Sequence, residues 1–246
     1  MLRSELVSYL NSYLEIDQYK DYAPNGLQVE GSEEIVTIVT GVTACNELIN
    51  EAIRLNADAI LVHHGFFWKS EAPEIVGYKQ KRIKNLLVND INLLGYHLPL
   101  DGHVELGNNA ELGKLWGLKD ITPEPGLVKL GVLEKPVSIE EFTDLVSDSL
   151  GRKALHLKGG PDMVKTIAWC SGGAQGYIDK AVEWRADVYI SGEVSEQTTH
   201  LAKECEIHYL AAGHHATERL GIKALGEHLS TKFNLHCHFV DIQNPV

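Results

Sequence analysis

The sequence feature that most constrains the fold is an internal repeat. A β-branched run, a helical stretch and a second apolar run occur between residues 36 and 64 and recur between residues 165 and 193. The matched residues, 129 positions apart, are Ile38 and Ile167, Ile49 and Ile178, Ala57-Asp58 and Ala186-Asp187, and His64 and Glu193. A second match, 117 positions apart, pairs residues 93–97 with 210–214 and Asp101 with Glu218. Strands and helices that alternate and recur in this way predict an α/β fold of two pseudo-repeated halves.

The boundary between the halves is expected in a stretch that is rich in proline and glycine. Composition shifts between residues 117 and 136, where regular structure is interrupted by Pro123, Pro125, Gly126, Gly131 and Pro136. We therefore expect a first α/β half over residues 1–125 and a second over residues 126–246, with the C-terminal segment able to pack on the first half.

Two helices can be placed from local signals. The N-terminus carries leucines at helical spacing, namely Leu2, Leu6, Leu10 and Leu14, and this pattern is typical of an amphipathic helix rather than of a signal peptide. In the second half, Ser138 and Glu141 form a capping box for a helix that reaches Leu150 and ends at Gly151.

Composition limits the classes of function. The net charge of −12 argues against general binding of nucleic acid, which depends on clustered Lys and Arg, although a bound metal could supply positive charge for a nucleotide. No apolar run has the length of a membrane span, so no membrane association is expected. Cys45, Cys170, Cys205 and Cys237 are widely scattered, which indicates buried, reduced thiols in a cytoplasmic protein.

The stretch Ile60-Leu61-Val62-His63-His64-Gly65 places two histidines at the end of a predicted buried strand. In open α/β sheets, ligands bind beyond the carboxyl ends of the strands. Two imidazoles at such an end, followed by Phe66, Phe67 and Trp68, are candidate metal ligands in an apolar collar. Alternatively, the two histidines are hydrogen-bonded within a loop.

Both halves also end a strand with histidine followed four residues later by a carboxylate, as His97 with Asp101 and His214 with Glu218. Residues four apart lie on one face of a helix, so His214 and Glu218 can reach a common ligand. Pro99 makes a regular helix unfavourable in the first copy, where we expect only a tight loop.

Histidines at three strand ends, two with repeat-related carboxylates, favour a metal site over histidines and carboxylates that only form local hydrogen bonds or caps. A mixed nitrogen and oxygen ligand set without thiolate suits Zn, Mn, Fe or Ni, and carboxylates can bridge two ions. Two neighbouring metals usually indicate hydrolytic chemistry.

Other polar features have weaker interpretations. The loop at residues 171–176 lies between a strand and a helix, as a phosphate-binding loop does, but it lacks the first glycine of G-x-G-x-x-G, and a tight turn is favoured. Glu193 takes the place of His64 in the repeat and is a hydrogen-bond partner of a metal ligand, a proton carrier or a solvated carboxylate. His215 should point away from the ligand His214, and His236 and His238 should lie on an exposed strand face.

The motifs in combination resemble the GTP cyclohydrolase 1 type 2 (Nif-three-like) family over nearly the whole chain. The residues that carry this resemblance are Asn25-Gly26-Leu27-Gln28-Val29, Val62-His63-His64-Gly65, His97 with Asp101, and Gly213-His214-His215-Ala216-Thr217-Glu218. The resemblance implies two intertwined α/β halves with mixed sheets and a ring-like homohexamer. It also implies two divalent metal ions per subunit, held by His63, His64, Asp101, His214 and Glu218, with His97 as a further ligand or a proton carrier.

Two functions are compatible with these residues. The first is a metal-dependent hydrolase that adds water to GTP or a related nucleotide and opens its imidazole ring, with His97 and Glu193 as candidate catalytic proton carriers. The second is a non-catalytic metal-binding or regulatory protein that acts through protein partners. A catalytic metal site keeps a ligand position open for water, whereas a structural one is closed by protein ligands.

Overall fold

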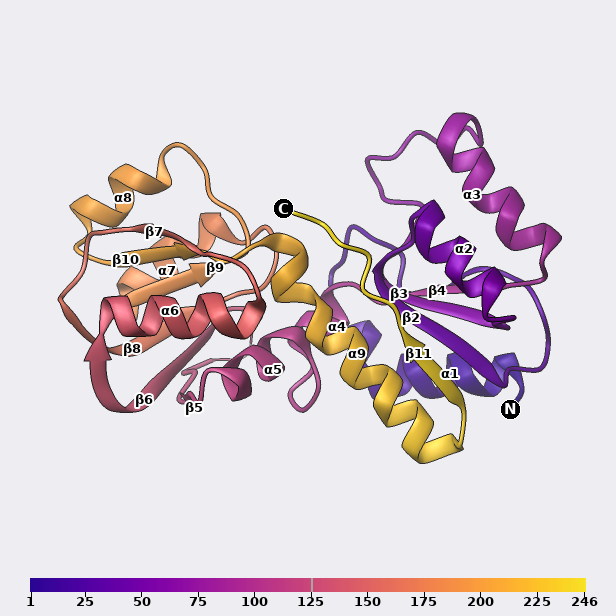
Figure 1. Ribbon diagram of the computed structural model, residues 1–246, viewed down its shortest axis with the longest axis horizontal. Helices are drawn as coiled ribbons and strands as arrows, with labels where there is room; N and C mark the ends of the chain where they lie inside the picture. The colour runs from indigo at the N-terminus through magenta and orange to yellow at the C-terminus, as the bar shows by residue number, and fades with distance from the viewer. Residues whose placement is uncertain (125) are drawn as a thin grey trace. The chain divides into compact units, whose positions relative to one another are not determined.

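The chain divides into two compact units in the computed structural model, which describes residues 1–124 and 126–246 (Figure 1). Unit 1 comprises Met1–Gly107 and Gly221–Gln243, and unit 2 comprises Asn108–Leu220 and Asn244–Val246. The chain therefore leaves unit 1 after Gly107 and returns to it within one long helix, α9 (His214–Phe233).

Unit 1 is built on a five-stranded mixed sheet with the order β1-β4-β3-β2-β11. Its helices are α1 (Arg3–Tyr13), the 3-10 turn η1 (Ile16–Gln18), α2 (Asn46–Arg54), α3 (Gly77–Val88), α4 (Leu98–Gly102) and most of α9; its strands are β1 (Gly26–Val29), β2 (Thr37–Thr43), β3 (Ala59–His64), β4 (Asn92–Gly95) and β11 (His236–Phe239). All neighbouring strands are parallel except β1, which is antiparallel to β4.

Helices cover both faces of this sheet, which explains why its strands are apolar on both sides. Ile38 and Leu61 face α1 and α9, whereas Val39 and Ile60 face α2 and α3 (Figure 1). The alternation follows from the two-residue period of a strand, and it gives unit 1 two hydrophobic layers.

Unit 2 is built on a six-stranded mixed sheet with the order β5-β6-β8-β9-β10-β7. Its helices are α5 (Asn108–Leu115), α6 (Ile139–Leu150), the 3-10 turn η2 (Gln175–Tyr177), α7 (Ile178–Glu183), α8 (Thr198–Glu204) and the start of α9; its strands are β5 (Lys119–Asp120), β6 (Lys129–Ser138), β7 (Leu155–Leu157), β8 (Met163–Trp169), β9 (Val188–Ser191) and β10 (His208–Ala211). The three central strands β8, β9 and β10 are parallel, and the others are antiparallel to their neighbours.

The predicted capping box of α6 is present. The Ser138 hydroxyl accepts a hydrogen bond from the Glu141 amide at 3.1 Å, and Gly151 ends the helix in the left-handed conformation. Phe142 and Val146 on this helix pack on one face of the sheet, while α7 and α8 cover the other.

Strand register confirms the repeat. Ile38 lies opposite Ala59 in unit 1, and Ile167 lies opposite Val188 in unit 2, so the corresponding members of the two pairs are 129 positions apart. A matching hydrogen-bond pattern accompanies this register. One Asp58 oxygen accepts from the amides of Val36 and Thr37 at 2.8 Å, and one Asp187 oxygen accepts from the amides of Lys165 and Thr166 at 2.8 Å.

The third strand of the repeat corrects the shift read from the sequence. Asn92 is the partner of Ala59, and His208 is the partner of Val188, so β4 and β10 correspond with a shift of 116 rather than 117. One additional residue, Gly213, follows β10 with φ +100°, a conformation that favours glycine. The shift of 117 therefore holds only from His214 onward.

The predicted loop at Pro99 is also corrected, because residues 98–102 form the short helix α4. Pro99 lies in the first turn, where an amide has no intrahelical partner to lose.

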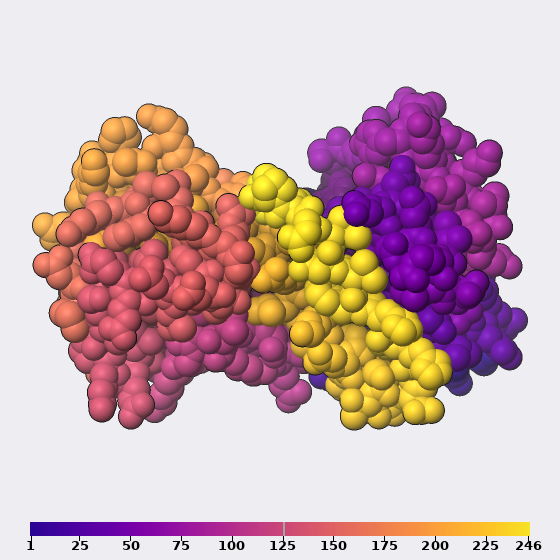
Figure 2. Space-filling view, in the orientation of Figure 1, coloured from indigo at the N-terminus to yellow at the C-terminus, as the bar shows by residue number. Residues whose placement is uncertain are grey.

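The units do not divide at the expected boundary between residues 125 and 126, and residue 125 itself lies outside the described residues. Leu112 and Trp116 pack in the core of unit 2, which assigns α5 to that unit. Conversely, residues 221–243, which follow the expected boundary, belong to unit 1. They pack there through Ile222 and Leu225 and through the pairing of β11 with β2. Figure 2 shows these yellow C-terminal residues against the indigo residues of unit 1.

Candidate metal centre

Three histidines and one carboxylate gather at the carboxyl ends of two neighbouring strands of unit 1. His63 and His64 end β3, His97 precedes α4, and Asp101 lies within α4. One ring nitrogen of each of the three histidines lies within 4.8 Å of the others. The Nε2 atom of His63 is 3.5 Å from Oδ2 of Asp101. We call these four residues the unit 1 donor set.

Hydrogen bonds orient the histidines of this set. The Nδ1 atom of His63 donates to the Tyr96 carbonyl at 3.1 Å, and Nδ1 of His97 donates to Oδ1 of Asp21 at 2.9 Å. A carbonyl or carboxylate only accepts, so the proton is assigned to Nδ1, and Nε2 keeps the lone pair that a metal needs. His64 lies next to Thr43, with 3.3 Å between Nδ1 and the hydroxyl oxygen.

Asp21 is a buried anchor for His97 that the sequence did not reveal. Its carboxylate also accepts from the amide of Leu98 at 2.9 Å and from the side chain of Asn25 at 3.1 Å, and Asn25 in turn accepts from the amide of His97. Burial favours the neutral acid, but the hydrogen bonds from His97, the Ala23 amide and Asn25 outweigh it and hold the pKa of Asp21 below its ordinary value. Asp21 and His97 are 76 residues apart, so no local pattern could have paired them.

Gln28 fixes the turn that follows β3. Its Oε1 atom accepts from the Phe66 amide at 2.7 Å, and its Nε2 atom donates to the Pro24 carbonyl at 2.9 Å. A Cβ at Gly65 would overlap the Gln28 side chain, so glycine lets Gln28 make these two hydrogen bonds where the strand ends beside the histidines. This contact gives a structural reason for the residues 25–29 motif.

Unit 2 contributes a histidine and two carboxylates at the start of α9. The Nε2 atom of His214 is 3.1 Å from Oε2 of Glu218, one helical turn further along. Its Nδ1 atom is 2.7 Å from Oε1 of Glu193, the residue that follows β9 by two positions. We call His214 and Glu218 the unit 2 donor set, with Glu193 as the hydrogen-bond partner of the imidazole.

The carboxylates of Glu218 and Glu193 stabilise the positively charged form of His214. Burial opposes protonation of His214, but the carboxylates of Glu218 and Glu193 outweigh it and raise the pKa of the imidazole to about 9. Glu218 is only 3 % exposed, and Asp101 in unit 1 is only 5 % exposed. Burial of a carboxylate costs free energy unless a cation, a proton or strong hydrogen bonds compensate for the lost water, and a metal ion is such a cation.

The loop at residues 171–176 packs against the unit 2 donor set. The Gly172 amide donates to the Thr217 hydroxyl at 3.0 Å, and a Cβ at Gly172 would overlap Oε1 of Glu218. The Ala174 amide closes a turn on the Gly172 carbonyl at 3.0 Å. The observed contacts are those of a tight turn that supports Glu218.

The structure thus places the predicted residues in two groups, His63, His64, His97 and Asp101 in unit 1, and Glu193, His214 and Glu218 in unit 2. His236 and His238 are exposed on β11, as predicted. Both groups offer imidazole nitrogen and carboxylate oxygen, the ligands that Zn, Mn, Fe and Ni accept.

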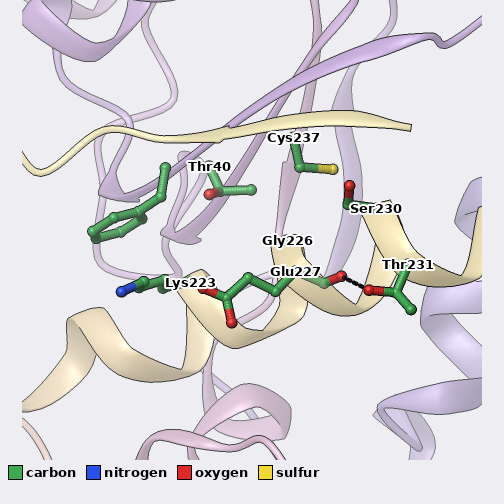
Figure 3. A pocket seen from close by; sticks show the side chains of 8 residues that line it. Thr40, Lys223, Gly226, Glu227, Ser230, Thr231 and Cys237 are labelled. Atoms are coloured by element: carbon green, nitrogen blue, oxygen red, sulfur yellow. Dashed lines mark hydrogen bonds between the residues drawn. The ribbon is translucent and has the colours of Figure 1, made fainter. Parts of the chain in front are cut away.

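A separate pocket of unit 1, with a volume of 320 Å³, lies between β2, β11 and α9 (Figure 3). It is lined by Thr40, Lys223, Gly226, Glu227, Ser230, Thr231, Cys237 and Phe239. The Thr231 hydroxyl bonds to the Glu227 carbonyl at 2.9 Å, within the helix itself. Predicted ligands are absent from this lining, so the pocket is distinct from the unit 1 donor set.

An α/β protein of two pseudo-repeated units, each with a buried carboxylate beside a histidine, has the donor groups of a metal-binding protein. The family model described as Duf34/NIF3 (NGG1p interacting factor 3) matches residues 1–245. The chain belongs to this family.

The similarity to known proteins extends over the full chain. The chain is 55% identical to the "GTP cyclohydrolase 1 type 2 homolog" of Haemophilus influenzae, covering 98% of each, and 52% identical to that of Escherichia coli strain K12, covering 100% of each. Among solved structures, protein ybgI, described as of unknown function, has a TM-score of 0.97 at 52% identity over all of both chains. Reduced HcgD from Methanocaldococcus jannaschii has a TM-score of 0.87 at 26% identity over 98% of both chains.

Helices long and apolar enough to cross a membrane are not found in the part of the chain that the structure describes.

Proposed function

We propose that the two donor sets hold the same pair of divalent metal ions, with His63, His64, Asp101, His214 and Glu218 as ligands. Support comes from the Nε2 atoms of His63 and His214, which lie beside Asp101 and Glu218 at 3.5 and 3.1 Å. A carboxylate has two oxygens and can bridge two cations, so one buried carboxylate from each unit suits a shared two-ion centre. The ligand chemistry fits Zn, Fe, Mn or Ni.

Residues around the ligands have separate tasks in this proposal. Glu193 accepts the Nδ1 proton of His214 and so directs Nε2 toward Glu218. Asp21 does the same for His97, whose Nε2 atom can then accept or deliver a proton close to His63 and His64. Glu193 remains a second candidate proton carrier, because its side chain is only partly buried.

The proposed activity is hydrolytic opening of a ring in GTP or a related nucleotide. If bound by these ligands, two divalent ions would activate a water and polarise the group under attack. The observation that carries the proposal is the same pairing of a histidine Nε2 with a buried carboxylate in both units. The printed names of relatives at 52–55% identity, GTP cyclohydrolase 1 type 2 homologs, indicate the substrate class to test.

The test is metal analysis followed by turnover. The purified chain, loaded separately with Zn, Fe, Mn or Ni, is incubated with GTP and a panel of nucleotides, and ring-opened products are measured by mass spectrometry. We expect about two ions per chain and product formation that requires them. Two ions without turnover of any nucleotide would favour the non-catalytic metal protein.

We also propose a ring-like homohexamer in the cytoplasm. Family membership supports the assembly. The location is supported by the cysteines at positions 45, 170, 205 and 237, all of them described by the structure and none in a disulfide bond. Only Cys170 is buried, which corrects the prediction of four buried thiols, because Cys205 lies exposed after α8. Light scattering tests the assembly: a hexamer has six times the chain mass of 27.2 kDa, and a monomer or dimer would contradict it.

A further inference from the structure

Two aromatic side chains stand beside the histidines of unit 1. The Trp68 ring centroid is 5.0 Å from that of His97 and 5.7 Å from that of His64. The Tyr22 centroid is 5.1 Å from that of His97 and 5.6 Å from that of Trp68. Tyr22 and Trp68 are therefore two aromatic side chains in contact with each other at the edge of the unit 1 donor set.

Hydrogen bonds hold the two loops that carry this pair. The Lys69 amide donates to the Tyr22 carbonyl at 3.0 Å, and the Lys69 ammonium donates to the Asp21 carbonyl at 2.7 Å. The Trp68 indole donates to the Gly65 carbonyl at 3.1 Å. The pair is thus fixed to the same loop, residues 21–25, that orients His97.

The backbone between β3 and Trp68 is held in an unfavourable conformation. Phe67 has φ +65°, which costs free energy for a residue with a side chain, and Oε2 of Glu71 accepts from the amides of Phe67 and Trp68 at 2.7 and 3.3 Å. The hydrogen bonds from Phe67 and Trp68 to Glu71 maintain this turn and so fix the position of the Trp68 side chain.

Exposure separates this pair from core aromatics. Tyr22 is 54 % exposed and Trp68 is partly buried, whereas Trp116 and Trp169 are each 2 % exposed. Aromatic rings that reach the surface beside metal donors contribute less to the core than buried rings, and they can stack on a planar ligand. Aromatic side chains stack on every nucleobase because every base has a π face.

We propose that Tyr22 and Trp68 form an aromatic platform on which the planar heterocycle of the substrate stacks, next to His64 and His97. This inference rests on the proposed function and deepens it, because it names the residues that bind the planar ring of the substrate and not its sugar or phosphate. The Lys69 ammonium places positive charge at the same loops, which suits an anionic substituent on that ring.

Calorimetric titration of the chain with GMP and with ribose 5-phosphate tests the platform, because the second probe has the sugar and phosphate but no ring. Tyr22→Leu should weaken GMP binding by about tenfold or more and leave ribose 5-phosphate binding unchanged. Tyr22→Phe, which keeps the ring, should bind GMP like the unmodified chain. Tyr78→Leu is the matched control, because Tyr78 is 65 % exposed on α3 and its ring contacts the Arg82 guanidinium rather than a histidine of the donor set.

Circular dichroism of each variant verifies the fold. Equal GMP binding by Tyr22→Leu and the unmodified chain, or no GMP binding by the unmodified chain, would overturn the platform. GMP binding that depends on Tyr22, without turnover of GTP, would support the platform while contradicting the hydrolase. Turnover of GTP with a KM that Tyr22→Leu leaves unchanged would contradict the platform alone.

Discussion

At the scale of single residues, Glu218 carries the most specific expectation. Glu218→Gln keeps the side-chain volume and nearly the same helix propensity but removes the charge that lets a carboxylate bind two cations. We expect at least one ion to be lost, with binding weakened by about tenfold or more, and any hydrolytic activity to fall with it. Elemental analysis, circular dichroism and turnover measure the three effects.

Glu227→Gln is the matched control, since Glu227 lies on the same helix but is exposed and lines the separate pocket (Figure 3). It should retain both ions. If Glu218→Gln also retains two ions and full turnover, Glu218 is not a ligand. Metal loss accompanied by unfolding would instead favour a structural metal.

Cys237 in the separate pocket gives a second expectation at this scale. Burial disfavours the thiolate and raises the pKa of Cys237 to about 11, so at pH 8 only about one thiol in a thousand is ionised. Iodoacetamide should therefore leave Cys237 unmodified while it alkylates the exposed Cys205, and the Cys237 rate should rise about tenfold per pH unit toward pH 11. Peptide mass spectrometry measures both rates, and equal rates at pH 8 would contradict the assignment.

At the scale of elements, the repeat extends to single hydrogen bonds. Asp58 and Asp187 each precede the second strand of the repeat, β3 or β9, and accept two backbone amides at the first strand of the repeat, β2 or β8. Asp58→Ala and Asp187→Ala both leave two amides without that acceptor and should each lower the free energy of unfolding by about 1–3 kcal/mol. Urea titration measures the change. Asp144→Ala on the exposed face of α6 should change it by less than about 0.5 kcal/mol, and a similar null result at Asp58 would contradict the shared role.

Local signals were sufficient for the elements but not for their assembly. The capping box at Ser138 and the repeat of Ile38 and Ile167 depend on residues close in sequence or on periodicity, and both are present. The helix at Pro99 was missed because proline is compatible with a first turn.

Contacts between distant residues left no local pattern. The bond from His97 to Asp21 spans 76 residues, and the pairing of β11 with β2 joins the end of the chain to its start. The sequence therefore predicted the histidines and carboxylates of each donor set and allowed the C-terminal segment to pack on the first half. It revealed neither the residue that orients His97 nor the point, at residue 221, where the chain returns to unit 1.

At the scale of the whole molecule, the central question is whether the two donor sets bind the same ions. Asp101 belongs to unit 1 and Glu218 to unit 2. If each unit bound an ion of its own, losses of metal-binding free energy in Asp101→Asn and Glu218→Gln would add within about 0.5 kcal/mol in the double variant. A shared pair of ions makes the two carboxylates ligands of one centre, so the second substitution acts on a centre that is already disrupted.

We therefore expect the double variant to lose less binding free energy than the sum of the single variants, by at least about 1 kcal/mol. Competition titrations with a metal-binding dye give the affinities of the four proteins, and Glu227→Gln combined with Asp101→Asn provides the additive reference. That reference should be additive because Glu227 lies outside both donor sets. Additive losses in the Asp101 and Glu218 pair would show that the units bind metal independently, and the shared two-ion centre, with the hydrolytic chemistry that depends on it, would have to be abandoned.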